Sequence, residues 1–375
     1  MNKKNVIIIM IDGGRLDRAL QSTIFKQLKS KSIFFSNSIT YGPHTIAAMH
    51  AVFSGSYGTR TGTNSYWSTF KFKKNKFKTL TEYLKEQNYY TCAEVVNELV
   101  LPKQGFDEFT IYDEKENNII SRHINLLKKM KSHNDHNKNF FLYVQYAGIH
   151  ATIIDEVLKA YDNFSKEYFD NKEKNKKRYD HLFKNAENYL KNILDEIKIL
   201  NLDQNSLILI MSDHGMSTGE KIGERAYGVF CYDYTLRTFT YFLSSDIQPI
   251  KIKQQVRTID FMPTILDYLQ IETDSAFSKM DGQSLIPLIN GKTMSEKIAF
   301  SETGNPLKEK APPKEPNVKS VRTSKWKLIW NIYDNTKEFY NLETDPDERN
   351  NLSGKNLPDE NLLWLELKKI NENTT

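Results

Sequence analysis

The chain has 375 residues, of which 39% are hydrophobic and 12% aromatic, and this is enough for a large buried core. Its net charge of +5 comes from lysine-rich tracts in which acids are interspersed, so we interpret these tracts as solvated surface and expect no nucleic-acid partner. The two cysteines exclude a disulfide framework and a zinc site built from cysteines.

An apolar run near the N-terminus extends from Val6 to Ile11. It ends at an acid, where a signal peptide would have small residues for cleavage, so a buried first strand fits it better. No segment reaches the ~20 apolar residues of a transmembrane helix. We therefore expect a cytoplasmic protein without a membrane span.

Strand and helix patterns alternate through the first two thirds of the chain. Residues 5–12 form a continuous, largely β-branched apolar run, which is typical of a parallel strand buried on both faces. Further strands are expected at residues 32–40, 89–96, 139–150 and 205–215, and helices at 16–31, 45–53, 79–88 and 179–200. This alternation predicts an α/β fold with a mostly parallel sheet.

The pattern changes after Tyr241. Residues 256–271 have helical spacing, and residues 319–342 have the pattern of a strand, a Tyr-Asp-Asn turn and a second strand. We therefore expect a small antiparallel sheet near the C-terminus. The predicted division is a large domain over residues 1–300 and a C-terminal subdomain over residues 301–375.

Side chains that can bind metals follow three of the expected buried strands. They are Asp12, His150, and the pair Asp213 and His214. The carboxyl ends of parallel strands line one crevice, where two carboxylates would repel each other and be costly to desolvate without a cation. We therefore predict one divalent metal ion, with Zn²⁺ or Mn²⁺ best suited and Mg²⁺ or Ca²⁺ also open. Its predicted ligands are Asp12, Thr45, Asp213 and His214.

Thr45 follows Gly-Pro-His and opens a predicted helix of small residues. Its hydroxyl is therefore either a helix cap or a reactive group. A hydroxyl bound to a metal has a lowered pKa and becomes a usable nucleophile near neutral pH. A helix N-terminus also favours a phosphate or sulfate group, and Ala47 and Ala48 leave room for one.

Together these motifs resemble the sulfatase family of the alkaline phosphatase superfamily. The resemblance rests on Asp12 in IIIMIDGGRLDR, on Thr45 ten residues before Gly55 in TIAAMHAVFSG, and on LIMSDHGMSTGEKIGE. It continues in DGQSLIPLING and EFYNLETDPDERNNL and covers most of residues 5–352. The resemblance implies an alkaline-phosphatase-like, doubly wound α/β core with a C-terminal antiparallel subdomain, a divalent metal and a covalent intermediate.

The chain departs from that family at the nucleophile. Sulfatases carry a Cys or Ser that is oxidised to formylglycine where Thr45 stands, Pro-Ser-Arg where this chain has Ala-Ala-Met, and usually a second acid where Gly13 stands. The site pattern is instead similar to phosphoethanolamine transferases and lipoteichoic acid synthases, which are Thr-nucleophile enzymes acting on phosphodiesters. The two-zinc members of the superfamily need a late histidine, and none follows His214, so we expect one metal.

Five further residues are candidates for roles beside the metal. We expect His150 to protonate the leaving group, the alternative being a crevice histidine without a catalytic role. Four cations are candidates for binding the anionic group of the substrate, and for each a structural role is the alternative. They are Arg15, Lys221, Arg225 and Arg237.

The leading hypothesis is a metal-dependent phosphoester hydrolase or phosphotransferase that works through a covalent Thr45 intermediate and favours phosphodiesters. One alternative is a sulfate-ester hydrolase without formylglycine, and another is an inactive homologue that binds a metal or a glycan. In each case the expected partner is a small-molecule or glycan-linked phosphate or sulfate ester.

Overall fold

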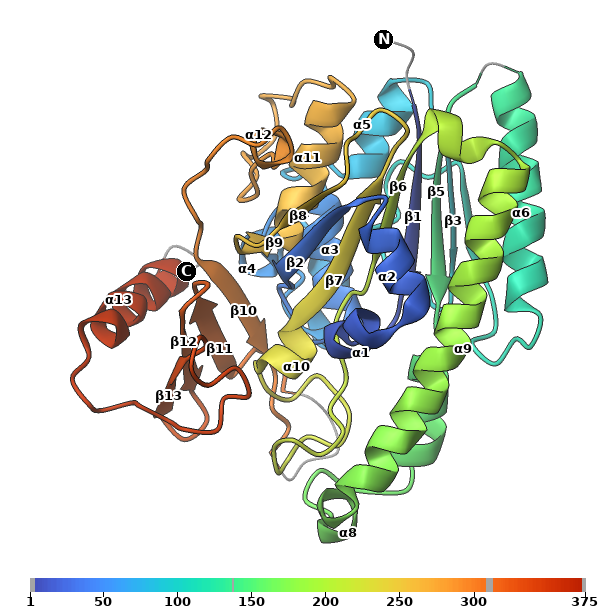
Figure 1. Ribbon diagram of the computed structural model, residues 1–375. Helices are drawn as coiled ribbons and strands as arrows, with labels where there is room; N and C mark the ends of the chain where they lie inside the picture. Colours follow the sequence, from blue (N-terminus) through green and yellow to red (C-terminus); the bar gives the residue numbers. More distant parts are fainter. Residues whose placement is uncertain (1–3, 137, 308–312, 373–375) are drawn as a thin grey trace.

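The computed structural model describes residues 4–136, 138–307 and 313–372 (Figure 1). Its larger part is built on a nine-stranded sheet in the order β4-β3-β5-β1-β6-β7-β2-β8, with β9 paired to β2. The strands are β1 (Asn5–Ile11), β2 (Ile33–Ile39), β3 (Tyr90–Val95), β4 (Glu108–Ile111), β5 (Phe140–Tyr146), β6 (Ser206–Met211), β7 (Arg237–Leu243), β8 (Ile250–Ile252) and β9 (Val256–Arg257).

Strand β1 lies in the middle of this sheet and pairs in parallel with both of its neighbours, β5 and β6. Every residue of β1 is buried, as its continuous apolar sequence predicts for a strand covered on both faces. Strand β7 runs antiparallel to β6 and β2. The mostly parallel sheet predicted from the sequence is therefore confirmed.

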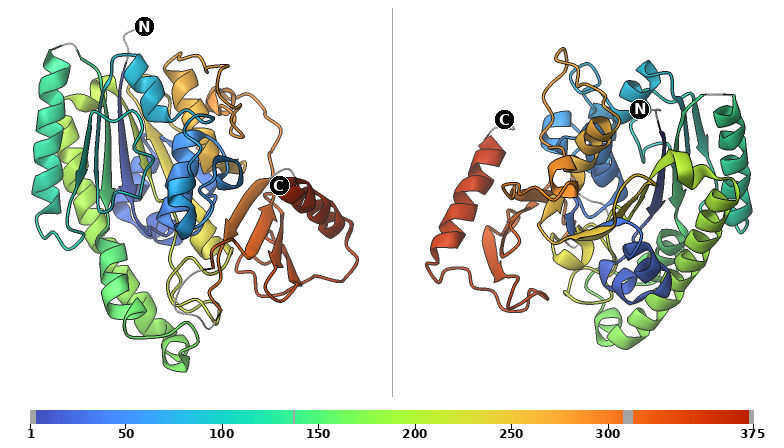
Figure 2. Two further views of the ribbon diagram at one scale, coloured as in Figure 1. Left: turned by 180° about the vertical axis from the view of Figure 1, so that it is seen from behind. Right: turned by 45° about the horizontal axis from the view of Figure 1, so that its top comes forward.

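Helices cover both faces of the sheet, so the core is doubly wound (Figures 1 and 2). Alternate residues of β1 point to the two faces: Ile7 and Ile9 into one apolar cluster, Val6 and Ile8 into the other. The first face is covered by α1 (Leu16–Gln21), α2 (Thr23–Lys29), α6 (Ile119–Asp135), α7 (Gly148–Ile153) and α9 (Lys172–Ile199). The second is covered by α3 (Thr45–Ser54), α5 (Leu80–Glu86), α11 (Phe261–Tyr268) and α12 (Ile286–Ile289).

The C-terminal part forms a separate four-stranded antiparallel sheet, which confirms the expected subdomain. Its strands are β10 (Ala299–Thr303), β11 (Val318–Arg322), β12 (Trp326–Asn331) and β13 (Thr336–Asn341), and α13 (Pro358–Glu372) packs on it. Strand β10 spans the predicted boundary at residue 301. Phe300 and Val321 share an apolar cluster with Tyr41 and Ala51, so the subdomain packs directly on the main domain near α3.

Several predicted elements have different bounds in the structure. The strand expected at residues 139–150 ends at Tyr146, and His150 lies on helix α7 instead of at the strand's end. The backbone N–H of Asp12 donates to the Tyr146 carbonyl at 3.0 Å, and two residues later Gly148 begins α7. The helix expected at 16–31 is interrupted at Ser22, whose backbone is extended and whose hydroxyl caps α2 by accepting the N–H of Phe25 at 3.3 Å.

One further strand and two helices also differ. The strand expected at 205–215 is β6, which ends at Met211. Helix α9 begins at Lys172, seven residues before the predicted start, so much of the lysine-rich tract is its exposed face. The helix expected at 256–271 begins at Phe261, because residues 256–257 pair with β2 as strand β9. Both cysteines are buried and unpaired. Within the described residues, no helix has the length and apolar character needed to cross a membrane.

Candidate active site

The carboxyl ends of β1 and β6 lie side by side and bring two acids together. Met10 pairs with Met211 in the parallel register, and Asp12 and Asp213 both follow two residues later. His214 completes a buried group in which one ligand atom from each residue lies within 4.8 Å of the others. The structure therefore gathers three of the four predicted metal ligands at one point, as the strand-end argument requires.

Thr45, the fourth predicted ligand, reaches the same point from α3. Its Oγ1 lies 3.4 Å from Asp12 Oδ2 and 3.5 Å from Nε2 of His214. Thr45 is the first residue of the helix, and the N-cap is His44, whose Nδ1 accepts a bond from the N–H of Ala47 at 3.4 Å. The alternative that Thr45 is itself the cap is therefore wrong, and its hydroxyl faces the acids.

The acids carry oxygens that no described group satisfies. Asp12 Oδ1 and Asp213 Oδ2 are buried and accept no hydrogen bond among the described residues. Burial and the nearby Asp12 charge raise the pKa of Asp213 to about 6. Two buried carboxylates with one free oxygen each, beside an imidazole and a hydroxyl, are a donor set that fits a divalent cation.

The polar atoms that do find partners orient the ligands. Asp213 Oδ1 accepts the backbone N–H groups of Gly13 at 3.1 Å and His214 at 2.9 Å, which leaves Oδ2 directed at the site. The Nδ1 of His214 lies 2.8 Å from the Gly215 carbonyl, which can only accept a hydrogen bond. Nδ1 therefore carries the proton of the neutral imidazole, and Nε2 keeps a free lone pair that faces the acids.

Gly13 shows why this site has one acid after β1. Its φ of +71° lies in the left-handed region, and a Cβ there would stand 2.5 Å from Met216 Cε. A second acid at this position would require both the backbone and Met216 to move. The backbone N–H of Gly13 takes up the Asp213 oxygen instead.

Sequence reasoning missed Gln145, the penultimate residue of β5. Its Nε2 donates to Asp12 Oδ2 at 2.8 Å, and its Oε1 accepts the backbone N–H of Val96 at 3.2 Å. Gln145 is fully buried, and it thereby fixes the orientation of the Asp12 carboxylate. A lone amide inside an otherwise apolar strand, near its carboxyl end, was the available signal.

His150 is linked to His214 by Tyr227, a residue that sequence reasoning also missed. Its Nε2 lies 2.6 Å from the hydroxyl of Tyr227, whose ring stacks on His214 with centroids 4.8 Å apart. Its Nδ1 lies 3.5 Å from Glu114. Burial lowers the pKa of His150, but the charges of Asp12 and Glu114 outweigh it and raise the value to about 9. The raised pKa keeps the His150 imidazole protonated near neutral pH.

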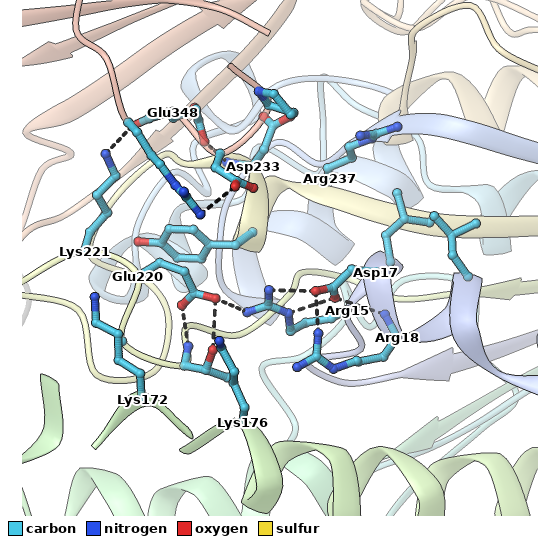
Figure 3. A pocket seen from close by; sticks show the side chains of 18 residues that line it. Arg15, Asp17, Arg18, Lys172, Lys176, Glu220, Lys221, Asp233, Arg237 and Glu348 are labelled. Atoms are coloured by element: carbon cyan, nitrogen blue, oxygen red, sulfur yellow. Dashed lines mark hydrogen bonds and ion pairs between the residues drawn. The ribbon is translucent and has the colours of Figure 1, made fainter. Parts of the chain in front are cut away.

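The four candidate cations do not gather around Thr45. Arg15 pairs with Asp17 at 2.9 Å and Glu220 at 2.6 Å, as Figure 3 shows. Lys221 donates to the backbone carbonyl of Glu348.

The other two cations hold backbone segments together. Arg225 donates to the Val157 carbonyl at 3.2 Å and to Asn163 at 3.1 Å. Arg237 donates to the Ser36 carbonyl at 2.9 Å. In the described residues, no lysine or arginine forms a hydrogen bond or ion pair with any of the four predicted metal ligands.

Comparisons with known proteins agree with this architecture. The sequence profile of the sulfatase family matches residues 4–271, and that of the C-terminal part of N-sulphoglucosamine sulphohydrolase matches residues 224–373. A choline-sulfatase of Rhizobium meliloti (strain 1021) is 25% identical over 163 residues. That match spans 43% of this chain and 30% of the relative's length.

Solved structures share the fold over nearly the whole chain. BT4656, in complex with its substrate D-glucosamine-2-N,6-O-disulfate, superposes with a TM-score of 0.76 at 17% identity, covering 99% of this chain and 98% of its own. The phosphonate monoester hydrolase of Agrobacterium radiobacter gives 0.77 at 12% identity, covering 100% and 96%. Ps i-CgsB, in complex with k-i-k-neocarrahexaose, gives 0.72 at 16% identity, covering 100% and 94%.

Proposed function

The chain belongs to the sulfatase family, and we propose that it is a metal-dependent hydrolase or transferase that attacks a phosphate ester with the hydroxyl of Thr45. The observation that carries the proposal is the position of that hydroxyl, 3.4 Å from Asp12 and 3.5 Å from His214. A threonine placed only to stabilise the helix would have no reason to face two buried acids.

One divalent cation, held by Asp12, Thr45, Asp213 and His214, would complete the site. The unsatisfied oxygens of Asp12 and Asp213 support this assignment. A cation there supplies Lewis acidity, which lowers the pKa of a hydroxyl and offsets charge that develops on phosphoryl oxygens.

The chain's own residues account for the proton movements. The hydroxyl proton of Thr45 passes to Asp12, the Thr45 oxygen attacks phosphorus, and the bond from phosphorus to the leaving alcohol breaks. His150 donates its proton to that alcohol, which leaves a phosphoryl group on Thr45.

In the second half-reaction, water or an acceptor alcohol attacks the phosphoryl group and gives its proton to His150. The bond from phosphorus to Thr45 breaks, and the Thr45 oxygen takes back the proton from Asp12. The N-terminus of α3, where Thr45 is the first residue, favours the anionic phosphoryl group through the helix dipole.

The identity of the nucleophile favours phosphate over sulfate. Formylglycine releases sulfate from its hydrate by elimination, and a sulfated threonine has no such route. Phosphodiesters are favoured among phosphates because one metal, without a lysine or arginine on its ligands, neutralises less charge than a monoester dianion requires.

A sulfate-ester hydrolase is the second candidate. The support for it is the family membership and the partial match to a choline-sulfatase. Structural neighbours bound to a sulfated sugar and to neocarrahexaose suggest a glycan-linked ester as the substrate under either chemistry.

The test is kcat/KM for matched nitrophenyl phosphate, bis-nitrophenyl phosphate and nitrophenyl sulfate, with Mn²⁺ or Zn²⁺. We expect the diester to be preferred, Thr45→Ser to keep part of the activity, and Thr45→Ala to lose at least about 10³-fold. The free energy of unfolding of Thr45→Ala should fall by less than the ~1 kcal/mol that an N-cap substitution costs, because His44 is the cap.

Intact-mass analysis after rapid quenching should show an adduct on the wild type and none on Thr45→Ala. The expected adduct is a nitrophenyl-phosphoryl group with bis-nitrophenyl phosphate, because one ester group stays on phosphorus, and a phosphoryl group with nitrophenyl phosphate. Faster turnover of the sulfate ester than of both phosphates would restore the sulfatase assignment. Full activity of Thr45→Ala would show that water, and not Thr45, attacks.

A further inference from the structure

A cavity of about 750 Å³ lies next to the candidate active site but is separate from it. Its walls come from α1, the first turn of α9, residues 218–221, residues 233–237 and residues 346–349 (Figure 3). None of the four predicted metal ligands lines it. Three of the cations that the sequence suggested for anion binding do: Arg15, Lys221 and Arg237.

Three acids of the lining pair with arginines of the lining, and Arg18 lies 2.7 Å from Asp17. Arg15 pairs with both Asp17 and Glu220, as Figure 3 shows. Arg349 pairs with Asp347 at 2.8 Å.

The other two acids of the lining, Asp233 and Glu348, pair with basic residues that do not line the cavity. Lys327, which does not line the cavity, lies 2.9 Å from Asp233 and 2.8 Å from Glu348. Arg322, also outside the lining, forms a second ion pair with Asp233 at 2.8 Å. The five acidic side chains therefore leave little negative charge to face the cavity.

Three cations of the lining have no such compensation. No described carboxylate lies within ion-pairing distance of Lys172, Lys221 or Arg237, and Lys176 pairs with Glu173 outside the lining. Figure 3 shows Lys172 and Lys221 toward one side of the cavity and Arg237 toward the other. The cavity therefore has a surplus of positive charge at separated points.

We propose that this cavity binds a small polyanion, with two or more sulfate or phosphate groups, independently of the metal site. Its volume falls within the ~300–1,000 Å³ range of ordinary ligand sites. Charges on opposite sides suit a ligand with more than one anionic group, because a single small anion would leave one side unpaired.

Titration calorimetry with naphthalene-1,3,6-trisulfonate tests the proposal on the metal-loaded protein, because sulfonates are not hydrolysed. Trimetaphosphate, titrated in parallel, distinguishes a preference for phosphate. We expect at least one probe to bind at one site. The double variant Lys172→Gln/Lys221→Gln should bind that probe about five-fold more weakly, because it loses two exposed ion pairs of ~0.5 kcal/mol each. Lys172→Gln alone should weaken binding about two-fold.

The matched control is Lys184→Gln, an exposed lysine of α9 that does not line the cavity. It should bind the probe as the wild type does, and so should Thr45→Ala. Saturating probe should leave turnover of bis-nitrophenyl phosphate unchanged. Absence of binding, equal affinity in the Lys172 variants, or competitive inhibition of turnover that persists in them would each overturn the proposal.

Discussion

Two buried clusters of charged side chains differ in their net charge. The interdomain cluster consists of Asp233, Arg322, Lys327 and Glu348, and it joins α10 (Asp233–Leu236) to the C-terminal subdomain. Two acids meet two bases, every ion pair is 2.8–2.9 Å long, and Glu348 also accepts the backbone N–H of Asp233 at 2.7 Å. Its charges cancel within the protein.

The strand-end cluster consists of Asp12, Asp213 and His214. It contains two acids and one imidazole, and two of its carboxylate oxygens accept no hydrogen bond among the described residues. The comparison teaches that burial alone does not define a functional site. In a balanced buried cluster each charge depends on its partners, and removal of one leaves an uncompensated charge. An unbalanced cluster of acids is instead suited to a cation that comes from outside the chain.

The largest expected effect comes from breaking the balanced cluster. Lys327→Met leaves Asp233 and Glu348 buried with one arginine between them, so we expect a loss of about 3–5 kcal/mol in the free energy of unfolding. Urea denaturation measures it. Lys325→Met, an exposed residue on the same segment, should change it by less than about 0.5 kcal/mol. Equal losses in both variants would show that the cluster has no special role.

The next effect is metal-dependent stability of the strand-end cluster. With free metal at 100 times its dissociation constant, the free energy of unfolding of the wild type should rise by about 2.7 kcal/mol. Asp213→Asn and His214→Ala should lose most of this gain and most of the bound metal. Thermal unfolding with and without Mn²⁺ or Zn²⁺, together with elemental analysis, measures both. Equal metal content in the three proteins would refute the site.

Without the metal, Asp213→Asn should stabilise the protein, whereas with the metal it should destabilise it. Burial and Asp12 raise the pKa of Asp213 to about 6, so its ionised form destabilises the metal-free fold at pH 7. Asp213→Asn keeps an oxygen for Gly13 and His214 and should be more stable than the wild type by about 1–3 kcal/mol.

Because the folded-state pKa of Asp213 is raised, this gain should shrink as pH falls from 7 through 6 towards 4, where the wild-type carboxyl is protonated. Urea denaturation of both proteins in chelator, at pH 7 and pH 5, measures the difference. A metal-free Asp213→Asn less stable than the wild type at pH 7 would contradict the unbalanced charge.

The smallest expected effect is on the pH dependence of kcat and comes from Glu114, which lies next to His150. Glu114 helps to raise the pKa of His150, so kcat should fall with rising pH where this proton donor is lost. Glu114→Gln should move this alkaline limb down by about one pH unit or less. Asp113→Asn, an exposed neighbour, is the control for the kcat profile. An unshifted limb would exclude His150 as the group that titrates.

The sequence by itself determined the sheet and the position of its acids. Continuous apolar runs such as residues 5–11 require cover on both faces, and that requirement sets a parallel, doubly wound sheet. Because parallel strands end at one edge, Asp12 and Asp213 had to converge once the strands were recognised. The antiparallel subdomain followed from equally local strand and turn patterns.

Only the tertiary structure decided the partners of the individual polar groups. Gln145 holds Asp12, Tyr227 joins His150 to His214, and Arg15 is engaged by two acids, yet each contact except Arg15–Asp17 spans more than ten residues of sequence or joins separate elements. Periodicity reports which face of an element is buried. It contains no information on which distant side chain meets a given hydrogen-bonding group, because packing of the whole chain sets that distance.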